Sequence, residues 1–142
     1  MAKTKTREKK NSTKYSKEQK QQILDDYKLG TVSREASYLG RKETLSGKAK
    51  FGIFGDGKEM PQIVMAKHFK NGDFRSGYYR DQSIMFALGR VSVQEFFAQL
   101  YAHANREAEP HTYGRQMNGH FSTRTIDKNG EWLNLTEMKN TS

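Results

Sequence analysis

Residues 74–101 read FRSGYYRDQSIMFALGRVSVQEFFAQLY, and this stretch holds the clearest folding signals in the chain. Ser92 and Glu95 have the spacing of a capping box, in which two side chains bond each other's backbone N–H groups at a helix start. Apolar side chains then recur at helical spacing, at Phe96, Phe97, Leu100, Tyr101 and Ala104. The sequence therefore predicts a helix that begins after Ser92 and buries one face.

The first half of this stretch predicts two further elements. Aromatic residues are concentrated over residues 74–79, which favours a short strand entering the interior. The segment from Ser83 to Leu88 is typical of a helix, and Gly89 would end it.

Two helices are expected before this stretch. Ser16 and Gln19 have capping-box spacing, and Ile23, Leu24 and Tyr27 then lie on one helical face. Gly30 would end that helix, because glycine is typical of the residue just past a helix. Ser33 would cap a second helix, with Ala36 and Leu39 directed inward, that runs to about Ser46.

The rest of the chain alternates between loops and one more helix. Residues 47–57 are predicted to be a loop, and Pro61 fits the first turn of a helix that ends before residues 71–72. Ile63, Val64, Met65 and Ala66 are its candidate buried residues. Residues 106–122 have few spaced apolar positions and predict a long ordered loop. Residues 125–133 carry a moderate hairpin signal around 128–130.

Composition limits the class of protein. The chain has 142 residues, no cysteine and a formal net charge of +9, with a pI near 9.7 and a mean hydropathy of −0.97. This length allows one domain with a thin core. The lack of cysteine excludes disulfides, thiolate metal sites and thiol nucleophiles. Without an apolar run long enough for a membrane span or a signal peptide, we expect a cytoplasmic protein that does not enter a membrane.

The positive charge is concentrated at the N-terminus. Residues 1–20 contain 8 Lys or Arg and 2 acidic residues, so they carry most of the net charge. Residues 1–15 are predicted to be a disordered basic tail, and residues 16–142 the folded part. A solvated terminus is the simpler interpretation, but a small basic nucleic-acid-binding or assembly protein is the alternative function that this charge leaves open.

Arg80 is a candidate anion-binding residue. It stands where the predicted strand ends and the helix after it begins, and a planar guanidinium can bind two phosphate oxygens at once. A phosphate group is the natural ligand of such a site. Local pattern alone leaves a second interpretation open, in which Arg80 pairs with Asp73 or Asp81 and the neighbouring tyrosines belong to the core.

His120 is a candidate substrate-facing residue in a polar, glycine-flanked loop, residues 114–121. A solvated loop histidine is the competing interpretation. The other histidines are His68, His103 and His111, and none has the helical spacing to a second ligand that a zinc site requires. No metal-ligating residue is therefore predicted in this chain.

Five short motifs together resemble a known family over about residues 36–121. They are residues 57–59 (GKE) with Gln62, 77–82 (GYYRDQ), 87–89 (ALG), 95–101 (EFFAQLY) and 114–117 (GRQM) with His120. In this order and spacing, the chain resembles the N-terminal part of the alpha subunit of the thiamine diphosphate-dependent 2-oxo acid dehydrogenases. The GRQM form is similar to the branched-chain, 2-oxoisovalerate members, whereas pyruvate-specific relatives usually carry Gly-Arg-Gly-Gly.

The resemblance implies a role for five residues. Tyr79 and Arg80 match a Tyr-Arg pair whose arginine holds the cofactor diphosphate, which agrees with the anion site inferred from local chemistry. Phe51 and Met117 match positions that line the substrate pocket, and an apolar wall suits a branched side chain. His120 falls beside the reacting centre, where imidazole can hydrogen-bond the substrate.

The resemblance also implies a fold and partners. The expected class is α/β, with this chain forming a helix-rich N-terminal fragment of a thiamine diphosphate-binding fold. Its cofactors would be thiamine diphosphate and Mg²⁺, with the Mg²⁺ ligands outside this chain. Its partners would be a beta subunit or fused beta half, a lipoyl-bearing acyltransferase and a 2-oxo acid, and no turnover is expected from the chain alone.

Residues 55–57 (GDG) match the opening of the metal signature of thiamine diphosphate enzymes. That signature continues with an Asn-Asn pair about 24–27 residues later, and the stretch from Arg80 to Ile84 has none. We therefore predict a tight turn at residues 55–57.

Overall fold

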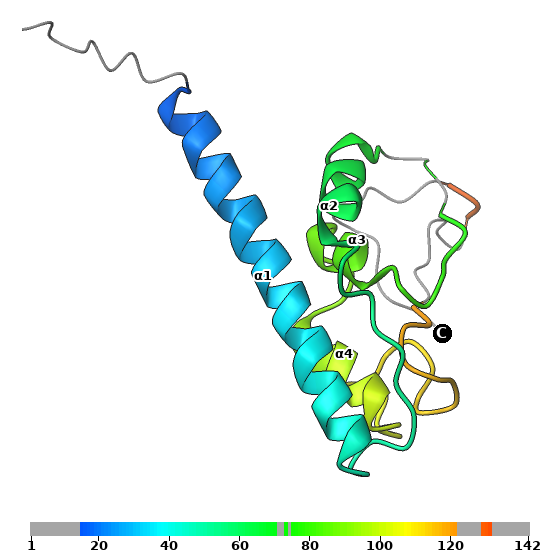
Figure 1. The fold of residues 1–142 in the computed structure, drawn as a ribbon. Helices are drawn as coiled ribbons and strands as arrows, with labels where there is room; N and C mark the ends of the chain where they lie inside the picture. The colour runs from blue at the N-terminus through cyan, green and yellow to red at the C-terminus, as the bar shows by residue number, and fades with distance from the viewer. Residues whose placement is uncertain (1–14, 71–72, 74, 122–128, 132–142) are drawn as a thin grey trace, which may run out of the picture.

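The computed structural model describes residues 15–70, 73, 75–121 and 129–131, and it contains four helices in this part of the chain (Figure 1). These are α1 (Lys17–Leu45), α2 (Glu59–His68), α3 (Gln82–Ala87) and α4 (Val93–Leu100). The helix-rich architecture is confirmed. The prediction of a strand over residues 74–79 is wrong, because the described residues 75–79 do not form a strand. None of the described helices is long and apolar enough to cross a membrane.

The α1 helix is one continuous helix of 29 residues, so the predicted break at Gly30 is wrong. Its start is as predicted, with a capping box between Ser16 and Gln19. Gly30 lies inside the helix, where a Cβ would be 3.6 Å from Cδ1 of Ile63 in α2. Ser33 is fully buried and its Oγ lies 2.7 Å from Oγ of Ser83 in α3. Gly30 and Ser33 are small enough for α2 and α3 to pack closely against α1. This tertiary packing outweighs the weak helix propensity of the two residues.

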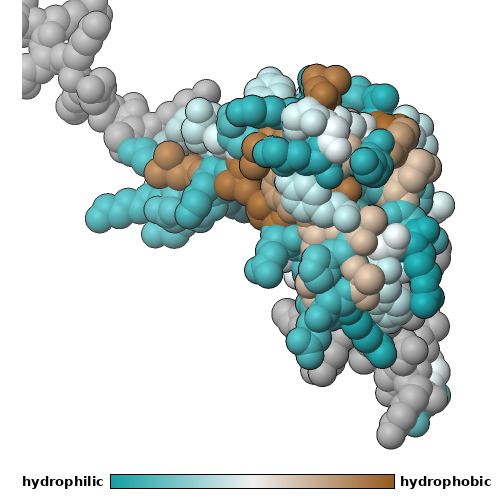
Figure 2. All heavy atoms as spheres, turned by 90° about the horizontal axis from the view of Figure 1, so that it is seen from below, coloured by the Kyte–Doolittle hydropathy of each residue, from teal (hydrophilic) through white to brown (hydrophobic). Residues whose placement is uncertain are grey.

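Most of the apolar side chains on the predicted faces of α1 are exposed to solvent. The first turns of the helix extend beyond the other helices (Figure 1), and Ile23, Leu24 and Tyr27 are 51–72% exposed. Ala36 is buried as predicted, whereas Leu39 is 49% exposed. Seen from below, hydrophobic side chains lie at the surface among hydrophilic ones (Figure 2). Apolar faces that a further element could cover are thus present on this molecule.

The core lies where α1, α3 and α4 meet. Phe96 of α4 is almost fully buried, and its ring packs against the rings of Phe54 and Phe86 at centroid distances of 6.3 and 5.9 Å. The buried cluster consists of Ala36, Ala49, Phe54, Ile84, Met85, Phe86, Val91, Phe96, Leu100 and Phe121. The predicted α4 is confirmed at its start, with a capping box between Ser92 and Glu95, but it ends at Leu100, so Tyr101 and Ala104 of the predicted face lie beyond the helix.

The α2 helix begins two residues earlier than Pro61, which stands in its first turn as predicted. Ile63 is buried, but Val64 and Met65 are about half exposed, contrary to expectation. The predicted loop at residues 47–57 is confirmed, and the one predicted over residues 106–122 is confirmed for its described part, residues 106–121. The basic tail, apart from Tyr15, and most of the hairpin expected over residues 125–133 lie outside the described residues.

Candidate functional site

Buried glutamines fix the turn that leads into α3. Gln62 of α2 donates from Nε2 to the Arg80 carbonyl at 2.8 Å and accepts from the Ile84 N–H at 3.1 Å. Gln82 donates from Nε2 to the Ser33 carbonyl at 2.9 Å and to Oγ of Ser37 at 2.9 Å. Both amides are largely buried, and buried polar groups are stable only when paired. The backbone of residues 80–84 is therefore held against both α1 and α2.

A buried carboxylate shapes the loop that follows α4. Glu109 is fully buried and accepts hydrogen bonds from the backbone of His111, Thr112 and Gly114 and from the Thr112 hydroxyl. Burial by itself would raise the pKa of Glu109, but these hydrogen bonds together lower it. The ionised carboxylate thus organises the turn from which residues 114–121 begin.

Two further amides hold residues 114–121 in place. Asn118 pairs with the backbone of Ile53 in both directions, at 3.2 Å for the Ile53 N–H and 2.8 Å for its carbonyl. Gln99 of α4 bonds the backbone of Gly119 at 2.7 Å and that of His120 at 2.7 and 3.2 Å. The loop is therefore anchored to α4 on one side and to residues 51–54 on the other.

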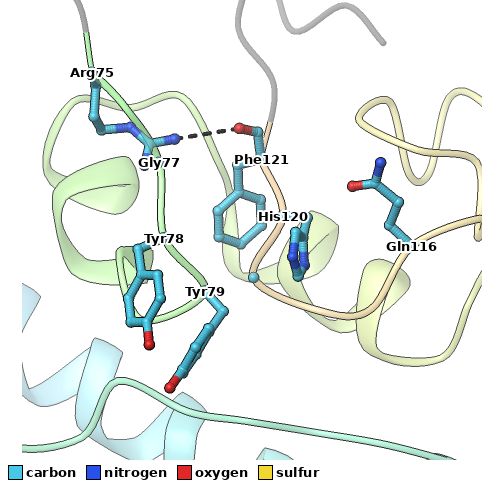
Figure 3. Close-up of a pocket in the computed structure, with 8 residues that line it drawn as sticks. Arg75, Gly77, Tyr78, Tyr79, Gln116, His120 and Phe121 are labelled. Atoms are coloured by element: carbon cyan, nitrogen blue, oxygen red, sulfur yellow. Dashed lines mark hydrogen bonds between the residues drawn. The ribbon is translucent and has the colours of Figure 1, made fainter.

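The first hollow lies between the segment before α3 and this loop (Figure 3). It has a volume of about 350 Å³ and is lined by Arg75, Gly77, Tyr78, Tyr79, Gln116, Gly119, His120 and Phe121. Arg75 donates to the Asp81 carboxylate at 2.6 Å and to the Phe121 carbonyl at 3.3 Å, so it joins the two walls. Predicted residues Tyr79 and His120 thus face one hollow.

Tyr78 and Tyr79 lie side by side at the edge of this hollow, with ring centroids 4.0 Å apart (Figure 3). The side chain of Tyr79 raises the pKa of Tyr78 through a hydrogen bond. The Tyr78 phenol therefore stays protonated at neutral pH.

Arg80 makes no salt bridge to the described residues, and its guanidinium lies 5.3 Å from the centre of the Tyr79 ring. Asp81 is paired with Arg75 instead, and the Asp73 carboxylate accepts from the Lys70 N–H at 2.6 Å. The interpretation in which Arg80 pairs with Asp73 or Asp81 is therefore wrong. Arg80 does not line this hollow; it is exposed beside it, with its positive charge available to a ligand.

The second hollow lies on the other side of the same loop. It has a volume of about 390 Å³, and its walls come from residues 48–51, from residues 99–102 at the end of α4, and from residues 114–118. Phe51 and Met117 both line it and are about half exposed. Gln116 lines both hollows. The predicted site residues thus divide into Tyr79 and His120 on one side, and Phe51 and Met117 on the other.

The orientation of the His120 ring defines its chemistry. Its Nδ1 lies 2.9 Å from the Met117 carbonyl oxygen. A carbonyl only accepts, so Nδ1 carries the hydrogen, and in the neutral ring Nε2 has the free lone pair. His120 can therefore accept a hydrogen bond or a proton at Nε2.

Sequence reasoning did not assign the amides that support these residues. Gln62, Gln82 and Gln99 fall within the motifs of the resemblance, but their hydrogen-bond partners lie between 18 and 49 positions away in the chain. Residues 55–57 form the predicted turn, and Asp56 pairs with Arg41 at 2.6 Å. The described residues include no cluster of three or more acidic or histidine side chains that could hold a metal ion.

The sequence is similar to known proteins of one family. The sequence profile of the Dehydrogenase E1 component family matches residues 27–132. The 2-oxoisovalerate dehydrogenase subunit alpha of Bacillus subtilis (strain 168) is 30% identical over 102 residues, which cover 71% of this chain and 30% of that protein. The chain thus spans about 30% of the length of this relative, and no solved structure matches it significantly. Because the family profile covers most of the sequence, the chain belongs to the dehydrogenase E1 component family.

Proposed function

We propose that this chain supplies one wall of a thiamine diphosphate site in a 2-oxo acid dehydrogenase. The observation that carries the proposal is the state of Arg80, whose guanidinium is exposed and makes no salt bridge to the described residues. The adjacent Asp81 would otherwise neutralise it, but Arg75 holds that carboxylate. The family match supports a role in an E1 component, whose complete domain we propose to be α/β.

The residues beside the first hollow fit a diphosphate group. Arg80 can bind two phosphate oxygens in a bidentate manner, and its backbone is fixed because Gln62 bonds its carbonyl at 2.8 Å. The Arg80 guanidinium also makes a cation–π contact with the face of the Tyr79 ring. When bound, thiamine diphosphate supplies a carbon nucleophile for decarboxylation. The ligands of Mg²⁺ would come from outside the described residues.

The substrate we propose is a branched-chain 2-oxo acid such as 2-oxoisovalerate. Phe51 and Met117 would contact its aliphatic side chain, since both line the second hollow. His120 lines the first hollow instead, so it would act from the cofactor side of the reacting centre, where it would accept a hydrogen bond, or take a proton, at Nε2, because Nδ1 is committed to the Met117 carbonyl. The name of the Bacillus relative supports this substrate class.

The proposed reaction requires partners. A beta subunit, or a fused beta half, would complete the cofactor site, and a lipoyl-bearing acyltransferase would receive the acyl group after oxidative decarboxylation. The hydrophobic side chains exposed on α1 and α2 support the idea that further protein surface covers this chain. By itself the chain would have no turnover.

A calorimetric titration tests this proposal. Thiamine diphosphate and inorganic pyrophosphate are titrated with Mg²⁺ into the full chain, first alone and then with a beta-type partner. We expect both ligands to bind, thiamine diphosphate more tightly with the partner, and decarboxylation of 2-oxoisovalerate only in the mixture. The absence of binding by either ligand under both conditions would contradict the proposal.

A further inference from the structure

The side chain of Gln99 is the point at which α4 holds the loop that carries His120. It is 1% exposed. Its Nε2 donates to the His120 carbonyl at 2.7 Å, while its Oε1 accepts from the N–H groups of Gly119 at 2.7 Å and of His120 at 3.2 Å. Both polar ends of one buried amide are thus committed to two consecutive residues.

Packing does not require a polar residue at this position. Gln99 lies on the buried face of α4 with Phe96 and Leu100. A methionine would fill a similar volume there, but it would leave the backbone of residues 119–120 without its partners. The specific contribution of glutamine is therefore the position of the loop.

The position of this backbone determines how the imidazole is presented. The Met117 carbonyl accepts a hydrogen bond from Nδ1 of His120 at 2.9 Å. This bond can form only while residues 117 and 120 keep their relative positions. Gly119 lies between them, and its N–H bonds Gln99. The contacts of Gln99 and of Met117 thus act on the same four-residue turn.

We propose that Gln99 is a positioning residue for His120: its amide fixes the turn that keeps Nδ1 protonated and leaves Nε2 as the acceptor beside the first hollow. The significance of this for catalysis rests on the proposed function, in which His120 meets the substrate. The placement of the ring does not depend on that function, so the two ideas can fail separately.

The experiment measures the tautomer of His120 in the full chain. Long-range ¹H–¹⁵N spectra of the imidazoles are recorded well above the ordinary histidine pKa, and the signals of His120 are identified by their loss in His120→Asn. The test variants are Gln99→Met, which removes all three hydrogen bonds, and Gln99→Glu, which keeps only the accepting oxygen. Gln94→Met is the matched control, because Gln94 lies exposed on the same helix.

We expect the Nδ1–H form in the wild type and in Gln94→Met. Gln99→Met should lose it in favour of the mixture typical of a solvated imidazole, and Gln99→Glu should lose it in part. The proposal is overturned if Gln99→Met keeps the Nδ1–H form, or if the wild type lacks it. It is also overturned if both Gln99 variants lose their helical circular dichroism, since Gln99 would then support the whole fold. A failure of cofactor binding would count against the proposed function and leave this result unchanged.

Discussion

The carbonyl of Tyr79 lies so close to Gly119 that a Cβ on Gly119 would come within 2.3 Å of its oxygen. This contact brings the two walls of the first hollow together, one leading to Arg80 and the other to His120. Gly119 also has a φ of +81°, which L side chains rarely adopt. The close approach of the two predicted site segments therefore depends on a position where only glycine fits.

We expect Gly119→Ala to destabilise the chain by about 2–4 kcal/mol, because left-handed strain adds to overpacking against a backbone oxygen. Gly47→Ala is the matched control, since Gly47 has a φ of +78° with no atom within 4 Å of the added Cβ. The control should cost only about 1–2 kcal/mol. Urea unfolding followed by circular dichroism measures both variants, and equal losses would show that the Tyr79 contact is not tight.

Two glycines inside α1 should respond to alanine in opposite directions. A Cβ at Gly40 would lie 2.3 Å from Cε1 of the buried Phe54, whereas a Cβ at Gly30 would lie 3.6 Å from Cδ1 of Ile63. Gly40→Ala should lose about 1–3 kcal/mol through overpacking. Gly30→Ala should gain up to about 1 kcal/mol from helix propensity. Stabilisation by both substitutions would contradict the packing of Phe54 against α1.

The Arg34–Glu59 ion pair should make the free energy of unfolding depend on pH under acidic conditions. Arg34 holds the pKa of Glu59 at about 2, with two hydrogen bonds of 2.6 and 2.7 Å. A carboxyl whose pKa is lowered by folding stabilises the folded state above its unfolded value near 4.5, and this contribution is lost as the pH falls toward 2.

Glu59→Gln should therefore cost about 1.5–3 kcal/mol at neutral pH, the range for hydrogen bonds to charged groups. The difference in unfolding free energy between the variant and the wild type should shrink as the pH is lowered through this window. Urea titrations at a series of pH values measure it. If the difference in unfolding free energy does not change with pH, this ion pair is not the cause of the lost stability.

Phe51 should influence substrate preference in the assembled enzyme. In the proposed function its ring contacts the aliphatic side chain of the substrate, so Phe51→Ala should lower kcat/KM for 2-oxoisovalerate by about 10–150-fold. The loss for pyruvate should be smaller, because its side chain is only a methyl group. Met65→Ala is the control, as Met65 is an exposed apolar residue on α2 that lines neither hollow. Equal losses on both substrates would indicate a folding defect.

Local signals predicted the parts of the fold that depend on neighbouring residues. The α4 helix was predictable because the capping box at Ser92 and the apolar spacing after it lie within a dozen residues. The continuity of α1 was not, because Gly30 and Ser33 are locally typical of a helix end and start. They remain helical through contacts with Ile63 and Ser83, which lie 33 and 50 positions away in the chain.

The candidate site was predictable to a similar extent. Tyr79 and His120 were identified by motif, and they line one hollow. The pairing of Asp81 with Arg75, which leaves Arg80 without a salt bridge, could not be predicted, because several neighbouring charges offered equivalent partners. The role of Gln99 was also hidden, since its bonds reach 20 and 21 residues along the chain. The assignments of Phe51, Met117 and His120 to substrate remain predictions.

The most direct measurement is the affinity of thiamine diphosphate for the wild type, Arg80→Ala and Arg106→Ala. Arg106 is the matched control, because it is also an exposed arginine stacked on a tyrosine, with its guanidinium 5.6 Å from the centre of the Tyr113 ring. We expect Arg80→Ala to weaken binding by about 1.5–3 kcal/mol, or about 10–150-fold, and Arg106→Ala to leave it unchanged. Equal affinity in all three proteins would contradict the central claim that Arg80 holds the diphosphate.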